Sequence, residues 1–181
     1  MNEEIKNVIA PSALEVTPNY LRLGSKYVKT LFIFTYPRYL STGWFSPIIN
    51  FPDLLDVGIF VNPVDPAAAL KNLRKKATQV EAQLIEQEEK GMIRNPILET
   101  ARTDIETLRD ALQQSRENMF TVGAYITMYA ETLEALRKLE GKVTNLLESR
   151  LIYAKPAVFQ QTEGLPSVMP LGLDQLSITT P

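Results

Sequence analysis

The residue types that most often carry out catalysis are missing from this sequence. None of its 181 residues is a histidine or a cysteine. This excludes disulfide bonds, thiolate nucleophiles, zinc sites built on thiolate or imidazole, and every catalytic triad that needs an imidazole base. The side chains left for chemistry or binding are carboxylates, a lysine next to a glycine, and groups of aromatic and basic residues.

Two groups of carboxylates could act in acid/base chemistry or hold a hard metal ion. Asp53 and Asp56 flank the start of a predicted strand, and Glu86, Glu88 and Glu89 crowd one end of a polar helix face. A catalytic pair of carboxylates needs surroundings that drive the two pKa values apart. Nothing in the sequence places two of them in one cleft. We therefore interpret both groups as solvated charges and expect no catalytic residue, no metal ion and no cofactor.

The single glycine-lysine pair, Gly141-Lys142, does not fit a phosphate-binding loop. Such a loop has the pattern G-x-x-x-x-G-K-[ST] between a strand and a helix, because its glycines let backbone amides close on the phosphates. Leu136 stands where the first glycine should be, and Val143 replaces the serine or threonine. The pair also falls inside a predicted helix, where glycine costs about 1 kcal/mol relative to alanine. The sequence thus predicts a chain that does not hydrolyse ATP by itself.

Composition and charge narrow the class of protein further. The chain is 45% hydrophobic and carries 19 basic against 21 acidic side chains, which gives a net charge of -2. This balance is typical of a globular protein and provides no cationic field for non-specific binding of nucleic acid. The first ten residues do not resemble a signal peptide, and no apolar run approaches the roughly 20 residues of a membrane helix.

Aromatic and basic side chains are the remaining candidates for a binding surface. Residues 27 to 60 contain nine of the fifteen aromatic residues, and the densest basic cluster lies at 74 to 76. We favour core packing together with one aromatic-edged contact surface. The three-residue basic cluster is smaller than the four to eight cations of a lipid-binding patch, so we interpret it as a solvated face. The candidate interaction residues are Tyr36, Arg38, Tyr39, Trp44, Phe45, Arg74, Lys75 and Lys76.

Alternating patterns predict strands in the first third of the chain. Leu14 to Leu23 and Tyr27 to Tyr36 are β-rich runs separated by Gly24-Ser25, which indicates a hairpin. The second run is apolar on both faces, as in a central strand covered on both sides. Ser41 to Asn50 predicts a short helix, and Leu54 to Val61 predicts another strand.

Two helix starts follow. Asp65-Pro66 and Asn95-Pro96 each place a capping side chain before a proline that needs no amide partner. Apolar residues at steps of three and four predict helices over 67–90, ended by Gly91, and over 96–118. The short turn between them predicts an antiparallel helical hairpin, which either projects from the sheet or lies on it.

The second half of the chain predicts a strand from Phe120 to Tyr129, a helix from Thr132 to Arg150 and a strand from Ile152 to Gln160. Pro156 marks the last strand as an edge or a bulge. The resulting fold class is α+β: a ferredoxin-like split βαβ sheet with an extra N-terminal hairpin strand and the helical hairpin as an insertion. We expect one domain over residues 1–161 with the insertion at 66–118. Residues 162–181, rich in Pro and Gly, predict an extended tail or linker.

Several strings in the sequence resemble a known family. They are APSALEV at 10–16, the run NYLRLGSKYVKTLFIFTYPRYLSTGWFSPIINFPDLLDVGIFVNPVD at 19–65, and LPSVMPLGLDQLSITT at 165–180. Together they are similar to the N-terminal domain of the conjugative-transfer ATPases, the large motors of type IV secretion systems. The resemblance extends over residues 9 to 180, including a charged helical hairpin between the two halves.

The resemblance carries expectations about function. Members of that family continue into a RecA-like motor domain and assemble at the cytoplasmic face of the inner membrane. No catalytic residue of the motor can be transferred to any position of this sequence. The resemblance implies a non-catalytic docking domain, peripheral at that membrane face. Its expected partners are inner-membrane channel subunits, the motor domain of the same ATPase and neighbouring copies. The competing hypothesis is a free-standing ferredoxin-like module that binds single-stranded nucleic acid by stacking bases on sheet aromatics.

Overall fold

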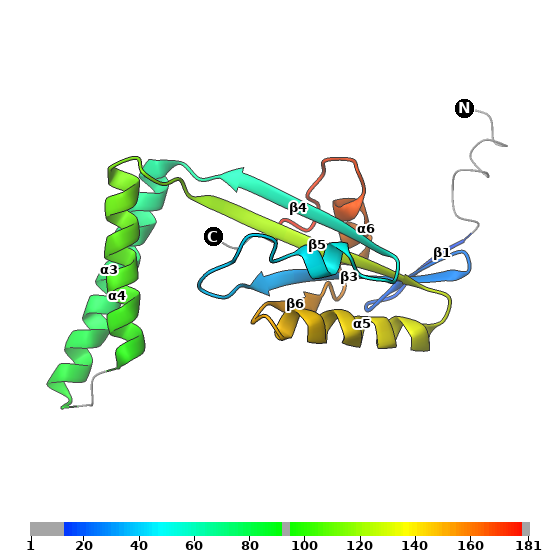
Figure 1. The fold of residues 1–181 in the computed structure, drawn as a ribbon, viewed down its shortest axis with the longest axis horizontal. Coiled ribbons are helices and arrows are strands. Elements are labelled where there is room, and N and C mark those ends of the chain that lie inside the picture. The colour runs from blue at the N-terminus through cyan, green and yellow to red at the C-terminus, as the bar shows by residue number, and fades with distance from the viewer. Residues whose placement is uncertain (1–12, 92–94, 179–181) are drawn as a thin grey trace. The chain divides into compact units, whose positions relative to one another are not determined.

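The computed structural model describes residues 13–91 and 95–178. Within them the chain forms two compact units. Residues 13–60 and 122–178 make up a mixed unit that we call the sheet unit, and residues 61–121 make up the hairpin unit. Figure 1 shows the elements of both.

Within the described residues, six strands form one open antiparallel sheet. Their order is β1-β2-β3-β5-β4. Strand β6 lies on the same side of β3 as β2: β2 pairs with the first residues of β3, and β6 pairs with its second half. The two central strands, β3 and β5, pair over six residues from Tyr27 with Ala130 to Phe32 with Tyr125. The strands are β1 (Leu14–Val16), β2 (Leu21–Leu23), β3 (Lys26–Thr35), β4 (Leu55–Pro63), β5 (Phe120–Ala130) and β6 (Tyr153–Pro156).

Both faces of the central strands are buried, as the doubly apolar pattern of β3 predicts. Side chains alternate across a strand. Leu31 and Ile33 point into one core, and Val28 and Phe32 into another. The prediction of a central strand is therefore confirmed. The prediction that Pro156 marks an edge or a bulge is confirmed as an edge, because β6 pairs with β3 alone among the described strands.

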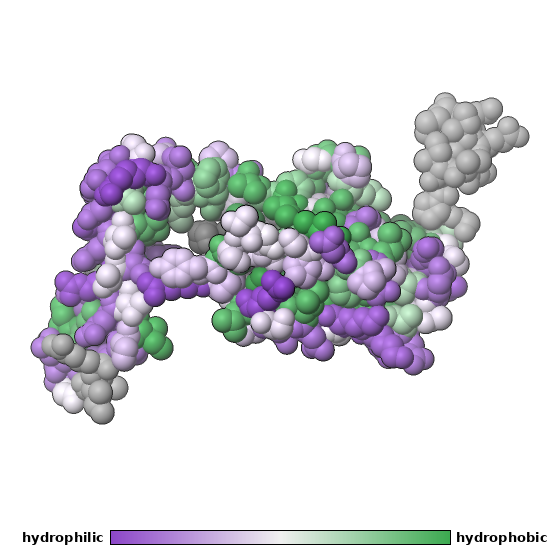
Figure 2. Space-filling view, in the orientation of Figure 1, coloured by the Kyte–Doolittle hydropathy of each residue, from purple (hydrophilic) through white to green (hydrophobic). Residues whose placement is uncertain are grey.

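Helix α5 (Leu133–Glu148) and the short helix α2 (Ser46–Ile49) cover the first face. Thr132 caps α5 by accepting a hydrogen bond from the Ala135 amide. The predicted apolar stripe of α5 is buried and meets Ile126 and Met128 of β5 in the first core. The buried residues of α5 are Leu136, Leu139, Val143 and Leu147. Hydrophilic residues cover the outer side of α5 in Figure 2.

The second face is covered by a segment that the sequence predicts to be an extended tail, and that prediction is wrong. Residues 161–168 form helix α6 (Gln161–Val168), which packs against β3. Leu165, Val168 and Leu176 join the second core. Figure 1 shows α5 and α6 on opposite faces of the sheet. The segment from Gln161 to Ile178 is thus an integral layer of the sheet unit, and we call it the C-terminal layer.

Close approach explains how a segment without periodicity can pack so well. A Cβ atom at Gly164 would lie 2.7 Å from Thr30 Cβ, and one at Gly58 would lie 2.3 Å from the carbonyl oxygen of Ser167. The buried amide of Gln161 accepts from Thr30 N at 2.8 Å and donates to the Ala157 carbonyl oxygen at 2.9 Å. Two glycines and one amide therefore hold α6 directly on the backbone of the sheet.

The hairpin unit contains helices α3 (Pro66–Glu89) and α4 (Pro96–Gln113). Both predicted caps are confirmed: the Asp65 side chain accepts from the Ala68 amide, and that of Asn95 accepts from the Ile97 amide. Gly91 follows α3 with φ +63°, as expected of a glycine that ends a helix. The core of this unit is small and consists of Ala69, Leu73 and Leu112, with Val64, Leu70, Ile105, Leu108 and Met119 packed around them.

Candidate interaction surface

The structure divides the predicted interaction residues between the two units. Tyr36, Arg38, Tyr39, Trp44 and Phe45 lie in the connection between β3 and β4, which belongs to the sheet unit. The basic triplet at 74–76 lies on α3 in the hairpin unit. The two groups are therefore separate candidates, and we consider the β3–β4 connection, residues 36–54, first.

Three aromatic rings anchor this connection to the sheet unit. Tyr36 and Trp44 meet edge to face with ring centroids 5.7 Å apart, and Trp44 meets Phe45 at 4.8 Å. These separations are typical of favourable aromatic pairs, each contributing about 1 kcal/mol beyond burial. Phe45 is only 6% exposed and joins the first core together with Ile48. Phe45 was predicted to line the interaction surface, but its burial makes it a core residue.

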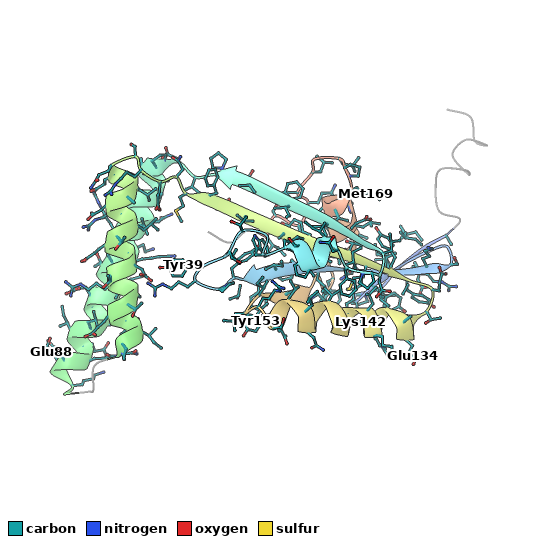
Figure 3. The ribbon with its side chains drawn as sticks, in the orientation of Figure 1. Tyr39, Glu88, Glu134, Lys142, Tyr153 and Met169 are labelled. Carbon is teal, nitrogen blue, oxygen red and sulfur yellow. The ribbon has the colours of Figure 1, made fainter. Side chains whose placement is uncertain are left out.

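Other side chains of the same connection face solvent. Tyr39 is 78% exposed, with the guanidinium of Arg38 5.3 Å from its ring centroid, and it is labelled in Figure 3. Ile49 is 72% exposed although it belongs to α2. Leu40 and Leu54 are exposed as well. The connection thus combines a buried aromatic anchor with exposed apolar side chains, and we call the exposed set, Arg38, Tyr39, Leu40, Ile49 and Leu54, the loop surface.

Local sequence fixes the path of this connection. Gly43 adopts φ +74°, a left-handed conformation that favours glycine, and its carbonyl oxygen accepts from the Ser46 amide at 3.0 Å. Pro47 occupies the first turn of α2, where no amide partner is needed. Near the end of the connection Asp53 pairs with Lys142 of α5 at 3.1 Å. The exposed apolar side chains are therefore displayed on a backbone with several fixed points.

Sequence reasoning missed the three apolar members of the loop surface. Leu40, Ile49 and Leu54 each stand in a stretch that also supplies core residues, so hydrophobicity alone predicts burial for all of them. A usable signal is the adjacency of Ile48 and Ile49 in a predicted helix. Consecutive residues do not share a helix face, so both isoleucines cannot point into one core. Accordingly Ile48 is 3% exposed and its neighbour faces solvent.

The basic triplet lies in the first half of α3, and Arg74, Lys75 and Lys76 are all exposed. Within the described part of the chain, none of these three side chains forms an ion pair with a carboxylate. By contrast, Arg102 of α4 pairs with Glu81 at 3.4 Å and with Glu106 at 3.5 Å. Exposure agrees with the predicted solvated face.

Three of the five carboxylates weighed for catalysis are bound to other side chains. Asp53 pairs with Lys142, Asp56 accepts a hydrogen bond from Tyr129, and Glu86 pairs with Lys90. Gly141 lies inside α5, as predicted, with open space where its Cβ would be. Within residues 13–91 and 95–178, no three acidic side chains gather as they would around a metal ion.

Two tyrosines next to carboxylates have perturbed ionisation. Burial is the main reason why the pKa of Tyr125 is raised above its ordinary value, and its hydrogen bond to Asp174 raises that pKa further. The pKa of Tyr129 is raised by burial and then by its hydrogen bond to Asp56. Both rings hold elements of the sheet unit together: Tyr125 reaches the C-terminal layer, and Tyr129 of β5 reaches β4.

We expect Tyr125 and Tyr129 to resist ionisation in the folded protein. A group whose pKa is raised by folding binds its proton more tightly in the native state, so its stabilising contribution is present below the ordinary tyrosine pKa of about 10 and is lost as the pH rises above it. Titration followed by tyrosinate absorbance should show late-ionising groups, and Tyr125→Phe should remove one of them. An unchanged titration would contradict the assignment.

Comparisons with known proteins do not identify a family. No protein-family model matches the sequence, and a search of curated proteins also found no match. The resemblance to conjugative-transfer ATPases therefore stays a prediction. Among the described residues, no helix combines the length and the apolar character that crossing a membrane requires.

Proposed function

We propose that this chain is a non-catalytic docking domain of a type IV secretion motor ATPase. In this role it binds inner-membrane channel subunits and neighbouring subunits at the cytoplasmic face of the membrane, and the motor chemistry belongs to another domain. The observation that carries the proposal is the loop surface, in which Tyr39 and Ile49 are more than 70% exposed. The same connection is fixed by the aromatic anchor, in which Phe45 is buried and Tyr36 and Trp44 are half-buried.

An anchored apolar surface suits protein binding for an energetic reason. Burying an exposed side chain in an interface stabilises a complex only if the cost of ordering it is small. The edge-to-face rings of Tyr36, Trp44 and Phe45 have already ordered the backbone that displays Tyr39. Aromatic residues and arginines are also the side chains that most often dominate binding energy, and Arg38 and Tyr39 form such a pair.

The alternative, a module that stacks nucleic-acid bases on sheet aromatics, has less support. Tyr125 of the central strand β5 is 0% exposed, and Phe32, its partner on β3, packs in the same core. The C-terminal layer covers the face to which both belong. Bases would have to displace α6 before they could stack on these rings. Retention of single-stranded nucleic acid with a steep salt dependence would nonetheless favour this alternative.

The ferredoxin-like assignment of the sheet belongs to the same proposal. Its support is the strand order β6-β3-β5-β4, with α5 between β5 and β6 and the short α2 between β3 and β4. The C-terminal layer on the opposite face and the added strands β1 and β2 extend that arrangement.

A competition experiment tests the docking role. In a donor strain that carries the transfer system encoding this sequence, excess free chain should occupy the docking site of the motor and lower the frequency of DNA transfer by about tenfold or more. Replacing Tyr39 and Ile49 by serine should abolish most of this inhibition. The matched control replaces Ile97, which is 77% exposed on α4, and the exposed Leu171 by serine. The control should inhibit like the unmodified chain.

Two results would count against the proposal. If the unmodified chain left transfer unchanged at high excess, docking through this domain would be excluded. Equal inhibition by the Tyr39 and Ile49 variant would place the binding site elsewhere. The purified chain should also show no rise in melting temperature with ATP, because a ligand that binds the folded state would stabilise it.

A further inference from the structure

The charges of α3 are separated along its length. The first fifteen residues of the helix, 66–80, contain four cations and no acid, and the last nine, 81–89, contain four glutamates and no cation. The cations are Lys71, Arg74, Lys75 and Lys76, and the glutamates are at 81, 86, 88 and 89. A solvated face of similar composition would normally mix the two signs, so this separation needs its own explanation.

Helix stability does not explain the separation. The helix dipole favours acidic side chains in the first turn and basic ones in the last turn. In α3 the first turn has no acid and the last turn has no base, and Glu86, Glu88 and Glu89 lie where the dipole disfavours them. Figure 3 labels Glu88 near the end of this helix. The arrangement costs the isolated helix stability, which suggests that a partner compensates for it.

An unpartnered seam runs along the same helix. The residues Lys71, Lys75, Thr78, Ala82, Ile85 and Glu89 are spaced alternately by four and three positions, which is the spacing of a helix-packing seam, and all six are exposed. The opposite side of α3 is occupied, since Leu73 packs against α4 residues. In the middle of the seam the surface is hollowed, and the hollow is lined by Ala77, Thr78, Glu81, Ala82 and Ile85.

The geometry points to a second copy of this chain as the partner of the seam: we propose that two α3 helices pair antiparallel about a two-fold axis at the level of Val80. Residues at equal distances from the axis then lie at the same level, so in the seam Lys71 meets Glu89 of the other copy and Lys75 lies beside Ile85. Arg74 and Glu86, which flank the seam, lie at the same level and can pair across it. Thr78 meets Ala82 in the centre, where small side chains permit close approach. A two-fold interface is self-complementary, and each pair occurs twice.

No other occupant fits the seam equally well. The cations at 66–80 would repel a uniformly basic helix, and the glutamates at 81–89 would repel a uniformly acidic one. A second α3 helix that runs in the opposite direction places its glutamates against the cations and its cations against the glutamates. Within the described residues neither Lys71 nor Glu89 forms an ion pair, so both are available to the second copy. This proposal is independent of the role in secretion.

Charge reversal on the full chain tests the pairing. Sedimentation equilibrium up to about 0.3 mM should show a monomer-dimer equilibrium that weakens as salt is added. Lys71→Glu together with Arg74→Glu should raise the dissociation constant by about tenfold or more, because four ion pairs become four repulsions. Glu86→Lys together with Glu89→Lys should do the same. The chain that carries all four reversals should recover dimerisation, since the reversed charges again face opposite partners.

The matched control reverses two exposed cations of α5, Arg137→Glu and Lys138→Glu, which changes the net charge equally and should leave the dimer intact. Circular dichroism checks that every variant is folded. A monomer at all concentrations overturns the proposal. A dimer indifferent to the α3 reversals, or a fourfold variant that does not recover, overturns it as well.

Disulfide cross-linking tests the direction of the pairing. Because the sequence contains no cysteine, an introduced cysteine is the one thiol of its chain and can form only the intended cross-link. An equimolar mixture of Thr78→Cys and Ala82→Cys chains should form disulfide-linked dimers faster than either chain alone, because an antiparallel pair places these positions opposite each other. Equal rates in the mixture and in the separate chains would contradict the antiparallel arrangement, even if the protein were dimeric. Failure of these tests would leave the loop surface and its competition experiment unaffected.

Discussion

A chain shortened to end at Gln160 should lose cooperative thermal unfolding. The deletion removes the C-terminal layer and uncovers the second core, where Val28 and Tyr125 are buried to 1% and 0% exposure. Each large apolar side chain returned to water costs about 1.5 to 3 kcal/mol, and several such losses exceed the total stability of 5 to 15 kcal/mol that is usual for a domain. The measurement is melting followed by near- and far-ultraviolet circular dichroism.

A point substitution tests the same layer without removing it. Gln161→Ala should lower the free energy of unfolding by about 3 kcal/mol, because it leaves the buried Thr30 amide without its acceptor and the Ala157 carbonyl without one donor. Unfolding should remain cooperative in this variant. If the shortened chain melted as sharply as the full one, α6 would be a dispensable appendage and the second core would not need it.

Gly58→Ala should destabilise the protein more than any other single methyl group added to the described residues of β4. The new Cβ would lie 2.3 Å from the Ser167 carbonyl oxygen and 3.1 Å from Val168 Cα, and both are backbone atoms of α6 that cannot move aside by a rotamer change. Overpacking of this kind typically costs 1 to 3 kcal/mol, and we expect a loss of about 3 kcal/mol in denaturant unfolding.

The control is the same substitution at Gly141. Nothing lies within 4 Å of a Cβ at that position, and it is inside α5. Alanine there should stabilise the protein by roughly 0.5 to 1 kcal/mol, because alanine has the higher helix propensity. If Gly58→Ala lowers the free energy of unfolding and Gly141→Ala raises it, contact with α6 decides the effect of the added methyl group. An unchanged free energy of unfolding for Gly58→Ala would mean that the C-terminal layer is not in close contact with β4.

The parts of the fold that could be predicted from the sequence are those set by local chemistry. Asp65-Pro66 and Asn95-Pro96 predict helix starts because the cap and the proline act within one turn. The strand around Leu31 is predictable because its apolar residues on both faces require cover on both sides. In each case the residues that determine the structure are neighbours in sequence.

The C-terminal layer could not be predicted because its determinants are distant in sequence. Gly164 and Pro166 inside an eight-residue segment are typical of a linker. The segment is helical because Thr30, 134 positions before Gly164, needs a partner without a side chain, and because Gln161 finds buried backbone groups to bind. Local propensity is overridden here by tertiary packing.

The candidate surface was predictable in part for the same reason. The aromatic cluster at 36–45 indicates a contact region, but the sequence does not tell which ring is buried. Phe45 and Tyr39 belong to one short stretch, and only the position of α2 places the first in the core and the second in solvent. The basic triplet lies in the hairpin unit and this stretch lies in the sheet unit. No local sequence pattern marks the boundary between the two units, so this separation could not be predicted.

The hydrogen bonds of Tyr125 have a mechanical consequence. Its hydroxyl donates to Asp174 and accepts from the Ile178 amide at 3.1 Å, while Leu176 is inserted between them in the second core. A tension applied at the last described residues would be borne by the middle of a central strand, which resists shear across its whole length, and would not peel an edge open. Residues 174–178 are thus fixed to the middle of a central strand, so load on this segment would pass directly into the interior of the sheet.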